Sequence, residues 1–296
     1  MIDLLLPFYG DPALLHLAVT SVLDQTDPRW RLRVIDDHYP DADAAAWVAE
    51  IDDPRVTLER NPTNLGVSAN FVHCLSRAEA DYLAFLGCDD VLGPTYVADV
   101  LGGFDRHPGA AIVQPAVRVI DASGAPARST TDWVKRRLSP DVVRETVLSG
   151  EPLACSLLHG NWLYFPAIAW NRNLIAQRSF RPGMETVLDL DLILSLVLDG
   201  HDVVLLENIS FEYRRHARSA SAVAARSTRR FEEEDLLFTR TAEACARLGW
   251  SRAARAARWH LTSRLHAALL APSAMFHRDV PTTRRLLRHA LARPLH

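Results

Sequence analysis

The stretch Tyr82–Asp90, with the sequence YLAFLGCDD, decides how the rest of this chain is interpreted. Its short apolar run is typical of a buried strand in an α/β sheet, and it stops at two adjacent carboxylates. In open α/β sheets, ligands bind at the edge formed by the carboxyl ends of the strands. Adjacent carboxylates repel each other and favour a counter-charge, such as a divalent cation that carries substrate phosphates. Taken alone, Asp89-Asp90 favours a solvated turn instead, because Asp is a common turn former.

The chain before this stretch alternates between strand and helix patterns. Strands are expected over 2–6, 30–35 and 56–59, and helices over 12–25, 42–51 and 68–80. This β-α-β order with short links predicts a parallel sheet with right-handed crossovers. The second strand also ends in an acidic pair, Asp36-Asp37. Because parallel strands end at the same edge, both acidic pairs are expected there, which is more specific than either pair alone.

The remaining chain predicts a less regular continuation of the sheet and then a helical end. Helices are expected over 94–104, 142–149 and 188–198, and strands over 111–119, 163–170, 203–206 and 209–213. From about residue 227 onward the patterns are mostly helical. A length of 296 residues accommodates one large α/β domain with an appendage.

Composition favours an ordinary globular protein of a reducing compartment. The four cysteines are scattered without a C-x-x-C pair, which argues against a disulfide framework and a zinc site. The N-terminus has no signal-peptide pattern, and no run of about 18 apolar residues predicts a spanning helix. We therefore expect a cytoplasmic protein.

Charge is unevenly distributed along the chain. The part from Arg214 onward holds 17 arginines and 6 acidic residues, whereas the preceding part holds 16 basic and 30 acidic residues. The acidic part suits a site that uses a metal ion. The basic end either meets an anionic partner or presents solvated helix faces. The anionic partner could be a membrane surface, a phosphorylated acceptor or the acidic body of the same chain. It has no recognised nucleic-acid motif and no interleaved aromatic residues, so no nucleic-acid partner is expected.

Seven motifs follow one another in a specific order: LPFY at 6–9, SVLDQT at 21–26, VIDD at 34–37, NLGVSAN at 64–70, LGCDD at 86–90, LDLD at 188–191 and YRRH at 213–216. In this order they resemble the family 2 glycosyltransferases with the GT-A fold, over roughly residues 2–220. The resemblance implies a Rossmann-like, mainly parallel α/β sheet flanked by helices, with a helical C-terminal extension. It implies a catalytic domain over 1–220, with a nucleotide-sugar half at about 1–120 and an acceptor half at about 121–220. Residues 221–296 form the helical C-terminal region.

The resemblance also implies a reaction: transfer of a sugar from a nucleotide-diphosphate sugar, with a UDP-sugar favoured, to an acceptor hydroxyl with inversion. The acceptor could be a saccharide, a lipid-linked saccharide or a natural product. A lipid-linked acceptor or the basic C-terminal part would bring a peripheral contact with the inner membrane face. The C-terminal helices carry apolar stripes that could cover the catalytic domain or a second subunit, and the second case would give a homodimer.

Residue roles follow from the matching motif positions. The resemblance assigns nucleotide-sugar binding to Pro7, Tyr9, Asp37, Asn64, Asn70, Asp89 and Asp90. Asp89 takes the position of the usual ligand for Mn²⁺ or Mg²⁺, and His216 is a second candidate metal ligand. Asn70 could equally satisfy a turn, and a lone histidine is more often structural. The first aspartate of the family's metal motif is replaced by Gly87, followed by Cys88.

The resemblance makes Asp189 the general base that takes the proton from the acceptor hydroxyl. Without the resemblance, a carboxylate stabilised by the dipole at a helix N-terminus would explain this residue. Two other functions stay open. A nucleotidyltransferase would carry a cationic loop after the first strand, which PFYGD at 7–11 lacks. A non-catalytic nucleotide-sugar-binding or scaffold protein would explain the loss of a carboxylate at Gly87.

Overall fold

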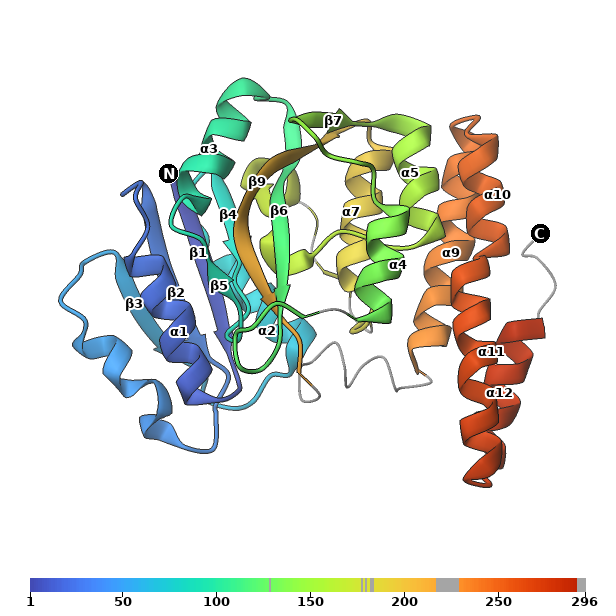
Figure 1. The fold of residues 1–296 in the computed structure, drawn as a ribbon, viewed down its shortest axis with the longest axis horizontal. Helices are drawn as coiled ribbons and strands as arrows, with labels where there is room; N and C mark the ends of the chain where they lie inside the picture. Colours follow the sequence, from blue (N-terminus) through green and yellow to red (C-terminus); the bar gives the residue numbers. More distant parts are fainter. Residues whose placement is uncertain (128, 177, 179, 182–183, 217–228, 292–296) are drawn as a thin grey trace.

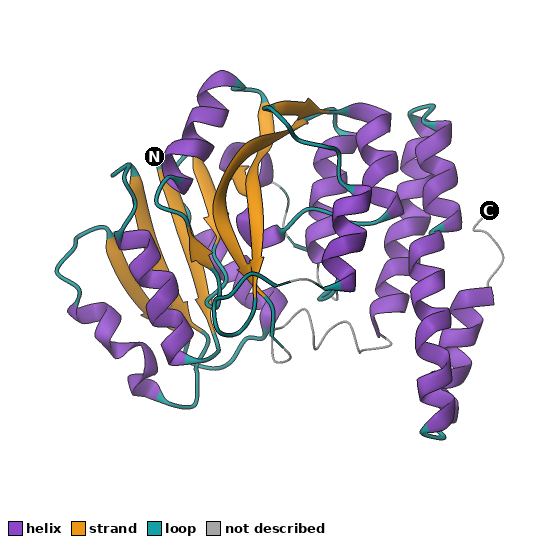
Figure 2. Cartoon of the chain, in the orientation of Figure 1, coloured by secondary structure: helices purple, strands orange, loops and turns teal. Residues whose placement is uncertain are grey.

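The computed structural model describes residues 1–127, 129–176, 178, 180–181, 184–216 and 229–291. A mixed sheet with helices on both faces makes up one end of the molecule, and the last helices stand together at the other end (Figure 1). Figure 2 shows the same division, with all strands on the side of the N-terminus. The predicted α/β fold with a helical C-terminal extension is therefore confirmed.

Nine strands form this sheet. They are β1 (Ile2–Phe8), β2 (Trp30–Asp36), β3 (Val56–Arg60), β4 (Tyr82–Phe85), β5 (Val91–Leu92), β6 (Ala110–Ile120), β7 (Thr146–Leu148), β8 (Ala169–Asn171) and β9 (Asp202–Arg214). Their order is β3-β2-β1-β4-β8-β6-β9-β5, with β7 also paired to β9. The first four strands along this order are mutually parallel, as the sequence predicts. Strand β8 then runs antiparallel to both β4 and β6, which makes the whole sheet mixed.

Helices connect and cover the strands. They are α1 (Pro12–Leu23), η1 (Ala42–Glu50), α2 (Val67–Ser76), α3 (Tyr96–Arg106), α4 (Thr130–Leu138), α5 (Gly150–His159), η2 (Phe165–Ala167), α6 (Arg172–Ile175), α7 (Leu188–Leu198), α9 (Arg229–Arg247), α10 (Ser251–Trp259), α11 (Leu261–Phe276) and α12 (Val280–Leu291). Asp11 caps α1 by accepting a hydrogen bond from the Ala13 amide (2.9 Å), and Pro12 occupies the first turn.

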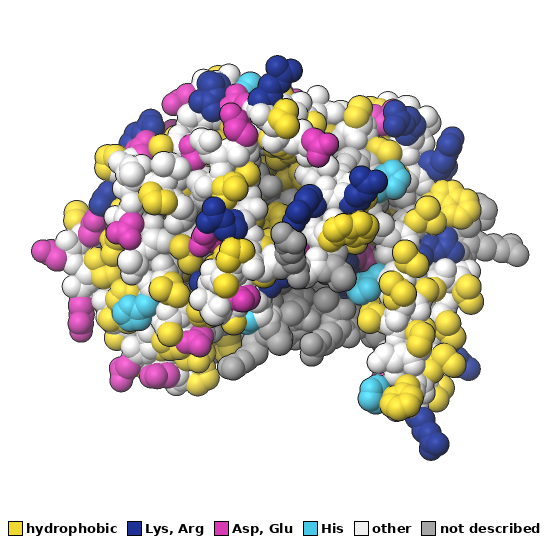
Figure 3. Space-filling model, viewed as in Figure 1, with side chains coloured by type: hydrophobic (Ala, Val, Ile, Leu, Met, Phe, Trp, Pro, Cys, Tyr) yellow, Lys and Arg dark blue, Asp and Glu magenta, His cyan; other side chains and the backbone are white. Residues whose placement is uncertain are grey.

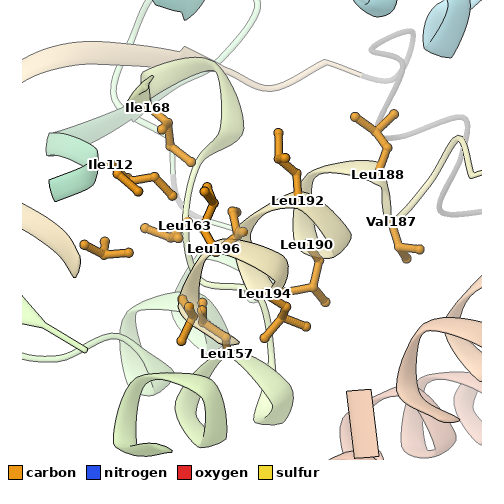
Figure 4. Close-up of a cluster of buried hydrophobic side chains, with 14 of the residues drawn as sticks. Ile112, Leu157, Leu163, Ile168, Val187, Leu188, Leu190, Leu192, Leu194 and Leu196 are labelled. Carbon is orange, nitrogen blue, oxygen red and sulfur yellow. The ribbon is translucent and has the colours of Figure 1, made fainter. Parts of the chain in front are cut away.

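The two faces of the sheet carry separate hydrophobic cores, because successive strand residues point to opposite faces. Leu4 and Leu6 of β1 pack with α1 and α3, whereas Leu5 belongs to the other core. Helix α7 lies at the centre of that second core, and its leucines pack against Leu157 and Leu163 (Figure 4). An almost entirely apolar α7 is thus buried on all sides, and this fixes the position of its first turn.

Three local predictions are wrong. Residues 142–149 form no helix: Thr146–Leu148 is strand β7 at the edge of β9, and the helix begins only at Gly150. Residues 163–170 form no continuous strand, because Pro166 cannot donate to a ladder and lies in the short helix η2. The two strands expected over 203–206 and 209–213 are one strand, β9. Its pairing with β6 continues through several shifts in register.

The C-terminal helices continue the second core outward. Helices α9 and α10 contribute Leu237, Phe238 and Ala254 to it, whereas α11 and α12 pack mainly on each other. Among the described residues, none of the helices combines the length and the hydropathy that crossing a bilayer would require. The apolar stripe expected on the C-terminal helices is visible on α11 as exposed hydrophobic side chains, among them Leu261, Leu265 and Leu269. Figure 3 shows hydrophobic side chains on this end of the molecule.

Candidate active site

The acidic pair lies in a turn that follows β4. The Leu86 amide still donates to the Leu5 carbonyl (2.9 Å), and the Asp90 amide then closes the turn onto the Gly87 carbonyl (3.2 Å). A Cβ atom on Gly87 would lie 2.5 Å from Asp90 Oδ2 and 3.0 Å from Asp89 Oδ1. Because Gly87 has no side chain, Asp90 Oδ2 and Asp89 Oδ1 can both lie in the space that a Cβ atom would occupy.

Asp90 is a buried carboxylate that is only half satisfied. Its Oδ1 accepts a hydrogen bond from the Arg214 amide (2.8 Å), while Oδ2 has no hydrogen-bond partner among the described residues. Burial, and next the negative charge of Asp89, raises the pKa of Asp90 well above its ordinary value. Such an oxygen favours a proton or a cation close to it.

The end of β9 brings the predicted histidine to this pair. His216 Nε2 lies 2.8 Å from Asp89 Oδ2, and the Arg214 guanidinium donates to the Asp89 carbonyl (2.8 Å). The sequence motif at 213–216 thus holds the acidic turn in place from a distant part of the chain. The residues predicted as metal ligands, Asp89 and His216, are in contact.

These side chains fit a divalent cation of the Mn²⁺ or Mg²⁺ type. Such ions prefer carboxylate oxygens and keep several positions for water and substrate phosphates. Asp89 Oδ1 and the partnerless Asp90 Oδ2 converge above Gly87, and His216 adds an imidazole at Asp89. With the two oxygens in these positions, a side chain at position 87 would collide with them, so this arrangement needs the glycine that stands there in place of the family's carboxylate.

Asp37 organises the loop after β3. Its Oδ1 accepts from Asn61 Nδ2 (2.8 Å) and from the Leu65 amide (2.9 Å), and its Oδ2 accepts from the Gly66 amide (3.0 Å). Gly66 begins α2 with a φ of 79°, a conformation that favours glycine. The contact between Asp37 and a nucleotide base stays a prediction, and the structure gives this carboxylate a loop-holding role.

The two predicted asparagines belong to the same network. Asn64 Nδ2 donates to the Asp37 carbonyl (3.1 Å), and the buried Asn70 accepts from Asn61 Nδ2 at Oδ1 (3.1 Å). Asn61, which joins Asp37 to Asn70, was not predicted. Its signal in the sequence is its position immediately after a strand, at the same edge as both acidic pairs.

Pro7 and Tyr9 lie at the end of β1, beside the acidic turn. Pro7 pairs in register with Ile35, and the Tyr9 ring is exposed and packs edge-on against Tyr39 at 5.4 Å. The loop after β1 comes so close that a Cβ atom on Gly10 would lie 3.1 Å from Cys88 Sγ. The β1 loop, the Asp37 loop and the acidic turn thus form one edge of the sheet.

Asp189 occupies the first turn of α7. Its Oδ2 accepts a hydrogen bond from Asn161 Nδ2 (2.8 Å), and its Oδ1 accepts from the Leu190 amide (2.8 Å). Burial is the main cause that raises the pKa of Asp189, and the positive charge of Lys135 opposes this effect. A desolvated carboxylate with a raised pKa is a stronger base than an exposed one.

Lys135, the only lysine of the chain, was missed by sequence reasoning. Its Nζ donates to the Leu163 carbonyl (2.6 Å) and lies 4.2 Å from the centre of the Tyr164 ring. Burial lowers the pKa of Lys135 to about 8, and the charges of Asp189 and Asp132 act in the opposite direction. No pattern around position 135 marks this lysine, but its being the only one could have drawn attention to it.

Helix α4 links the acidic turn to the surroundings of Asp189. Arg215, next to the histidine at the end of β9, binds both oxygens of Asp132 at 2.6 Å. Asp132 also accepts from the Tyr164 hydroxyl (3.0 Å), and Lys135 follows one turn later on α4. These residues all lie in the predicted acceptor half, and Arg215 connects them to the acidic turn through its chain neighbours Arg214 and His216, which contact Asp89.

Similarity to known proteins agrees with this geometry. A family model described as Glycosyl transferase family 2 matches residues 3–166. MT1568 of Mycobacterium tuberculosis is 26% identical over 238 residues, which cover 78% of this chain and 72% of that protein.

Solved structures share the fold at low sequence identity. S. aureus TarS 1-349 has a TM-score of 0.69 and 11% identity, covering 98% of this chain and 81% of that chain. The same segment in complex with UDP-GlcNAc has a TM-score of 0.65 and 13% identity, covering 99% and 92%. Mannosyltransferase PcManGT from Pyrobaculum calidifontis, in complex with GDP-Man and Mn²⁺, has a TM-score of 0.59 and 16% identity, covering 98% and 86%.

Proposed function

The chain belongs to glycosyl transferase family 2, and we propose that this glycosyltransferase moves a sugar from a nucleotide-diphosphate sugar to an acceptor hydroxyl with inversion. The observation that carries the proposal is the acidic turn, where Asp89 and Asp90 converge above Gly87 and His216 pairs with Asp89. Asp90 has an oxygen with no hydrogen-bond partner among the residues that the structure describes, and its place at the binding edge of the sheet suits a diphosphate held through a cation.

Each group has a defined part in this reaction. A divalent cation held by Asp89, with Asp90 and His216 beside it, would supply positive charge to the leaving diphosphate. The new bond forms between the acceptor oxygen and the anomeric carbon, and the bond from that carbon to the diphosphate oxygen breaks. The diphosphate keeps the electron pair, and Asp189 takes the proton of the acceptor hydroxyl.

The environment of Asp189 supports its role as the base. Its raised pKa makes proton transfer from a hydroxyl more favourable, and Asn161 and the Leu190 amide fix the orientation of the carboxylate. The buried α7 places this carboxylate on a rigid element rather than on a loop. A single displacement with a base on the acceptor side accounts for inversion.

A UDP-sugar is the proposed donor. Support comes from TarS, whose structure holds UDP-GlcNAc, although PcManGT holds GDP-Man within the same fold. Asp37 and the loop at 64–66 are the groups of this chain that would meet the nucleotide. Their hydrogen bonds to one another give this part of the site a defined shape before any ligand binds.

The predicted contacts with a membrane or with a second subunit stay predictions. Helices α11 and α12 leave large apolar side chains exposed, among them Leu269 and Phe276. Arg284 and Arg288 line one surface hollow of these helices together with the exposed Met275 and Leu291. This combination suits an anionic membrane surface, and an apolar face of this kind also suits a homodimer.

Calorimetric binding of UDP, GDP and other nucleoside diphosphates tests the donor site, with Mn²⁺, with Mg²⁺ and with a chelator. We expect metal-dependent binding of UDP by the wild type and its loss in Asp89→Asn, because the amide has no charge to offer the cation. The matched control is Asp81→Asn. Asp81 is exposed and immediately precedes β4, at the end of the strand opposite to the acidic turn, so this variant should bind nucleotide like the wild type.

Three outcomes would contradict parts of the proposal. Equal binding with metal and with chelator would remove the cation from the mechanism. Tight metal-dependent binding of GDP alone would replace the UDP-sugar by a GDP-sugar. Binding without any transfer or donor hydrolysis, over a broad set of acceptors, would favour the non-catalytic nucleotide-sugar-binding protein.

A further inference from the structure

Three residues that are far apart in the sequence meet between the C-terminal helices. Asp235 comes from α9, His260 from the junction of α10 and α11, and His289 from α12. One ligand atom of each residue lies within 4.8 Å of those of the other two. Both imidazoles are buried, with exposed fractions of 1% and 5%, whereas the Asp235 side chain is 49% exposed.

The surroundings of His260 define which of its nitrogens is free. Its Nδ1 lies 3.2 Å from the Ala257 carbonyl, which can only accept, so Nδ1 carries the proton. Its Nε2 then presents a lone pair, and it has no hydrogen-bond partner among the described residues. The nearest acidic atom is Asp235 Oδ1 at 3.8 Å, which also cannot donate when ionised.

His289 shows the same pattern with its nitrogens exchanged. The Ser263 hydroxyl donates to the Glu234 carboxylate, so its oxygen accepts from His289 Nε2 at 2.7 Å. The proton of His289 therefore lies on Nε2, and Nδ1 presents a lone pair 3.1 Å from Asp235 Oδ1. Two imidazole lone pairs and one carboxylate thus face a common point.

This arrangement is unfavourable unless positive charge occupies that point. A proton on His289 would pair it with Asp235 but would leave His260 Nε2 without a partner. A metal ion satisfies all three atoms at once. Metal-binding histidines usually donate their second N–H to a carbonyl, a carboxylate or another fixed acceptor, and both histidines do so here.

The local structure holds His260 in place at a cost. Its φ is 31°, in the left-handed region that few non-glycine residues adopt, at the break between α10 and α11. The Phe238 ring stacks on the imidazole, with 5.1 Å between centroids and 11° between planes.

We propose that Asp235, His260 and His289 bind a divalent transition metal ion of the Zn²⁺ type, which ties α9, α10, α11 and α12 together. Two imidazoles and one carboxylate suit such an ion better than Mg²⁺, which prefers oxygen ligands. The exposed side of Asp235 gives the ion a route of entry and a position for water. The four scattered cysteines excluded a cysteine zinc site, but not this one.

A hydrolytic triad would be another reading of Ser263, His289 and Asp235, which follow one another at 2.7 and 3.1 Å. A nucleophilic serine must donate its proton to the histidine and be open to substrate. The Ser263 hydroxyl is buried and donates to Glu234 instead. The metal site is therefore the better interpretation of this cluster.

The test is a titration of chelator-treated, full-length protein with Zn²⁺ and Co²⁺, in an Asp89→Asn background that removes the donor-site carboxylate. We expect one tightly bound equivalent by elemental analysis, visible Co²⁺ absorption, and a higher melting temperature with Zn²⁺. Asp235→Asn and His289→Gln should each lose this equivalent. His266→Asn, a histidine of α11 outside the cluster, is the matched control and should keep it.

Ser263→Ala tests the positioning of the imidazole, since it removes the acceptor of His289 Nε2–H. We expect affinity to fall by roughly 10–100-fold, with a changed Co²⁺ spectrum, and Ser263→Thr to restore both. Absence of a bound equivalent in the wild-type cluster would overturn the proposal. The same equivalent retained in folded Asp235→Asn and His289→Gln would overturn it as well.

Discussion

The acidic turn after β4 and the first turn of α7 both hold carboxylates whose pKa is raised by burial, yet they differ in what surrounds the oxygens. Asp90 has one oxygen without a hydrogen-bond partner in the described part of the chain, and its charged neighbour on the same turn is another carboxylate. Asp189 has both oxygens bound by neutral donors, and the nearby charge is that of Lys135, a cation.

This difference separates two ways of using a buried carboxylate. At the acidic turn two carboxylates meet, and Arg214 and His216 compensate their charge only in part, which favours a cation and the phosphates it carries. At α7 a single carboxylate is bound by neutral donors and lies near one cation, so it can take one proton during the reaction. The comparison predicts that changes at α7 affect proton transfer, whereas changes at the acidic turn affect binding of nucleotide and metal.

The largest effect is expected for Asp189→Asn. An amide of the same shape can still accept from the Leu190 amide, but its NH2 group replaces the oxygen that accepts from Asn161, and it cannot take a proton. We therefore expect kcat to fall by about 10²–10⁴-fold. Metal-dependent nucleotide binding, measured by calorimetry, should stay unchanged. Asp191→Asn is the control, because this neighbour on α7 pairs with Arg181 instead. Loss of nucleotide binding in Asp189→Asn would break the comparison.

Gly87→Ala tests the other side with an intermediate effect. The new methyl group would meet Asp90 Oδ2 and Asp89 Oδ1, so the carboxylates must move apart. We expect metal-dependent nucleotide binding to weaken by roughly 10–100-fold, the range found when the support of a metal ligand is lost. Gly109→Ala is the control, because nothing lies within 4 Å of its added Cβ.

Unchanged nucleotide affinity in Gly87→Ala would show that the convergence of the two carboxylates has no part in binding. A fall in kcat at saturating donor, with affinity unchanged, would place the acidic turn in the chemical step alone. Either result would remove the distinction between the two carboxylate sites.

Much of this site could be predicted from the sequence because strand ends are local signals. A run of apolar residues followed by Asp89-Asp90 fixes both the strand and the edge at which its end lies. The pairing of His216 with Asp89 follows from the family motif, since no local pattern joins positions 127 residues apart. The prediction of a strand over 163–170 is wrong because Pro166 interrupts the apolar run and lies in the short helix η2.

Lys135, Asn161 and the C-terminal histidines could not be predicted, for a different reason. Each gains its role from residues brought close only by packing: Lys135 from the burial of α4, and His260 from a break between two helices. Periodicity identifies which face of a helix is apolar, but it does not identify which polar residue on that face finds a distant partner.

The smallest effect is expected for Lys135→Met. It should appear as a shift of the pH profile of kcat/KM rather than as a change in the maximal rate. The positive charge of Lys135 lowers the pKa of Asp189, so its removal raises that pKa further. Because the base must be ionised, kcat/KM should begin to fall at a higher pH on the acid side than in the wild type. Lys135→Arg keeps the charge and should keep the wild-type profile.

The pKa of Lys135 itself limits where this difference is seen. Since that pKa is about 8, the wild-type lysine loses its charge above this pH, and wild type and Lys135→Met should converge there. The measurement is the pH profile of kcat/KM for all three proteins at saturating metal. Identical acid limbs in Lys135→Met and Lys135→Arg would mean that charge at position 135 does not tune the base, and that Asp189 is held by its neutral hydrogen-bond donors alone.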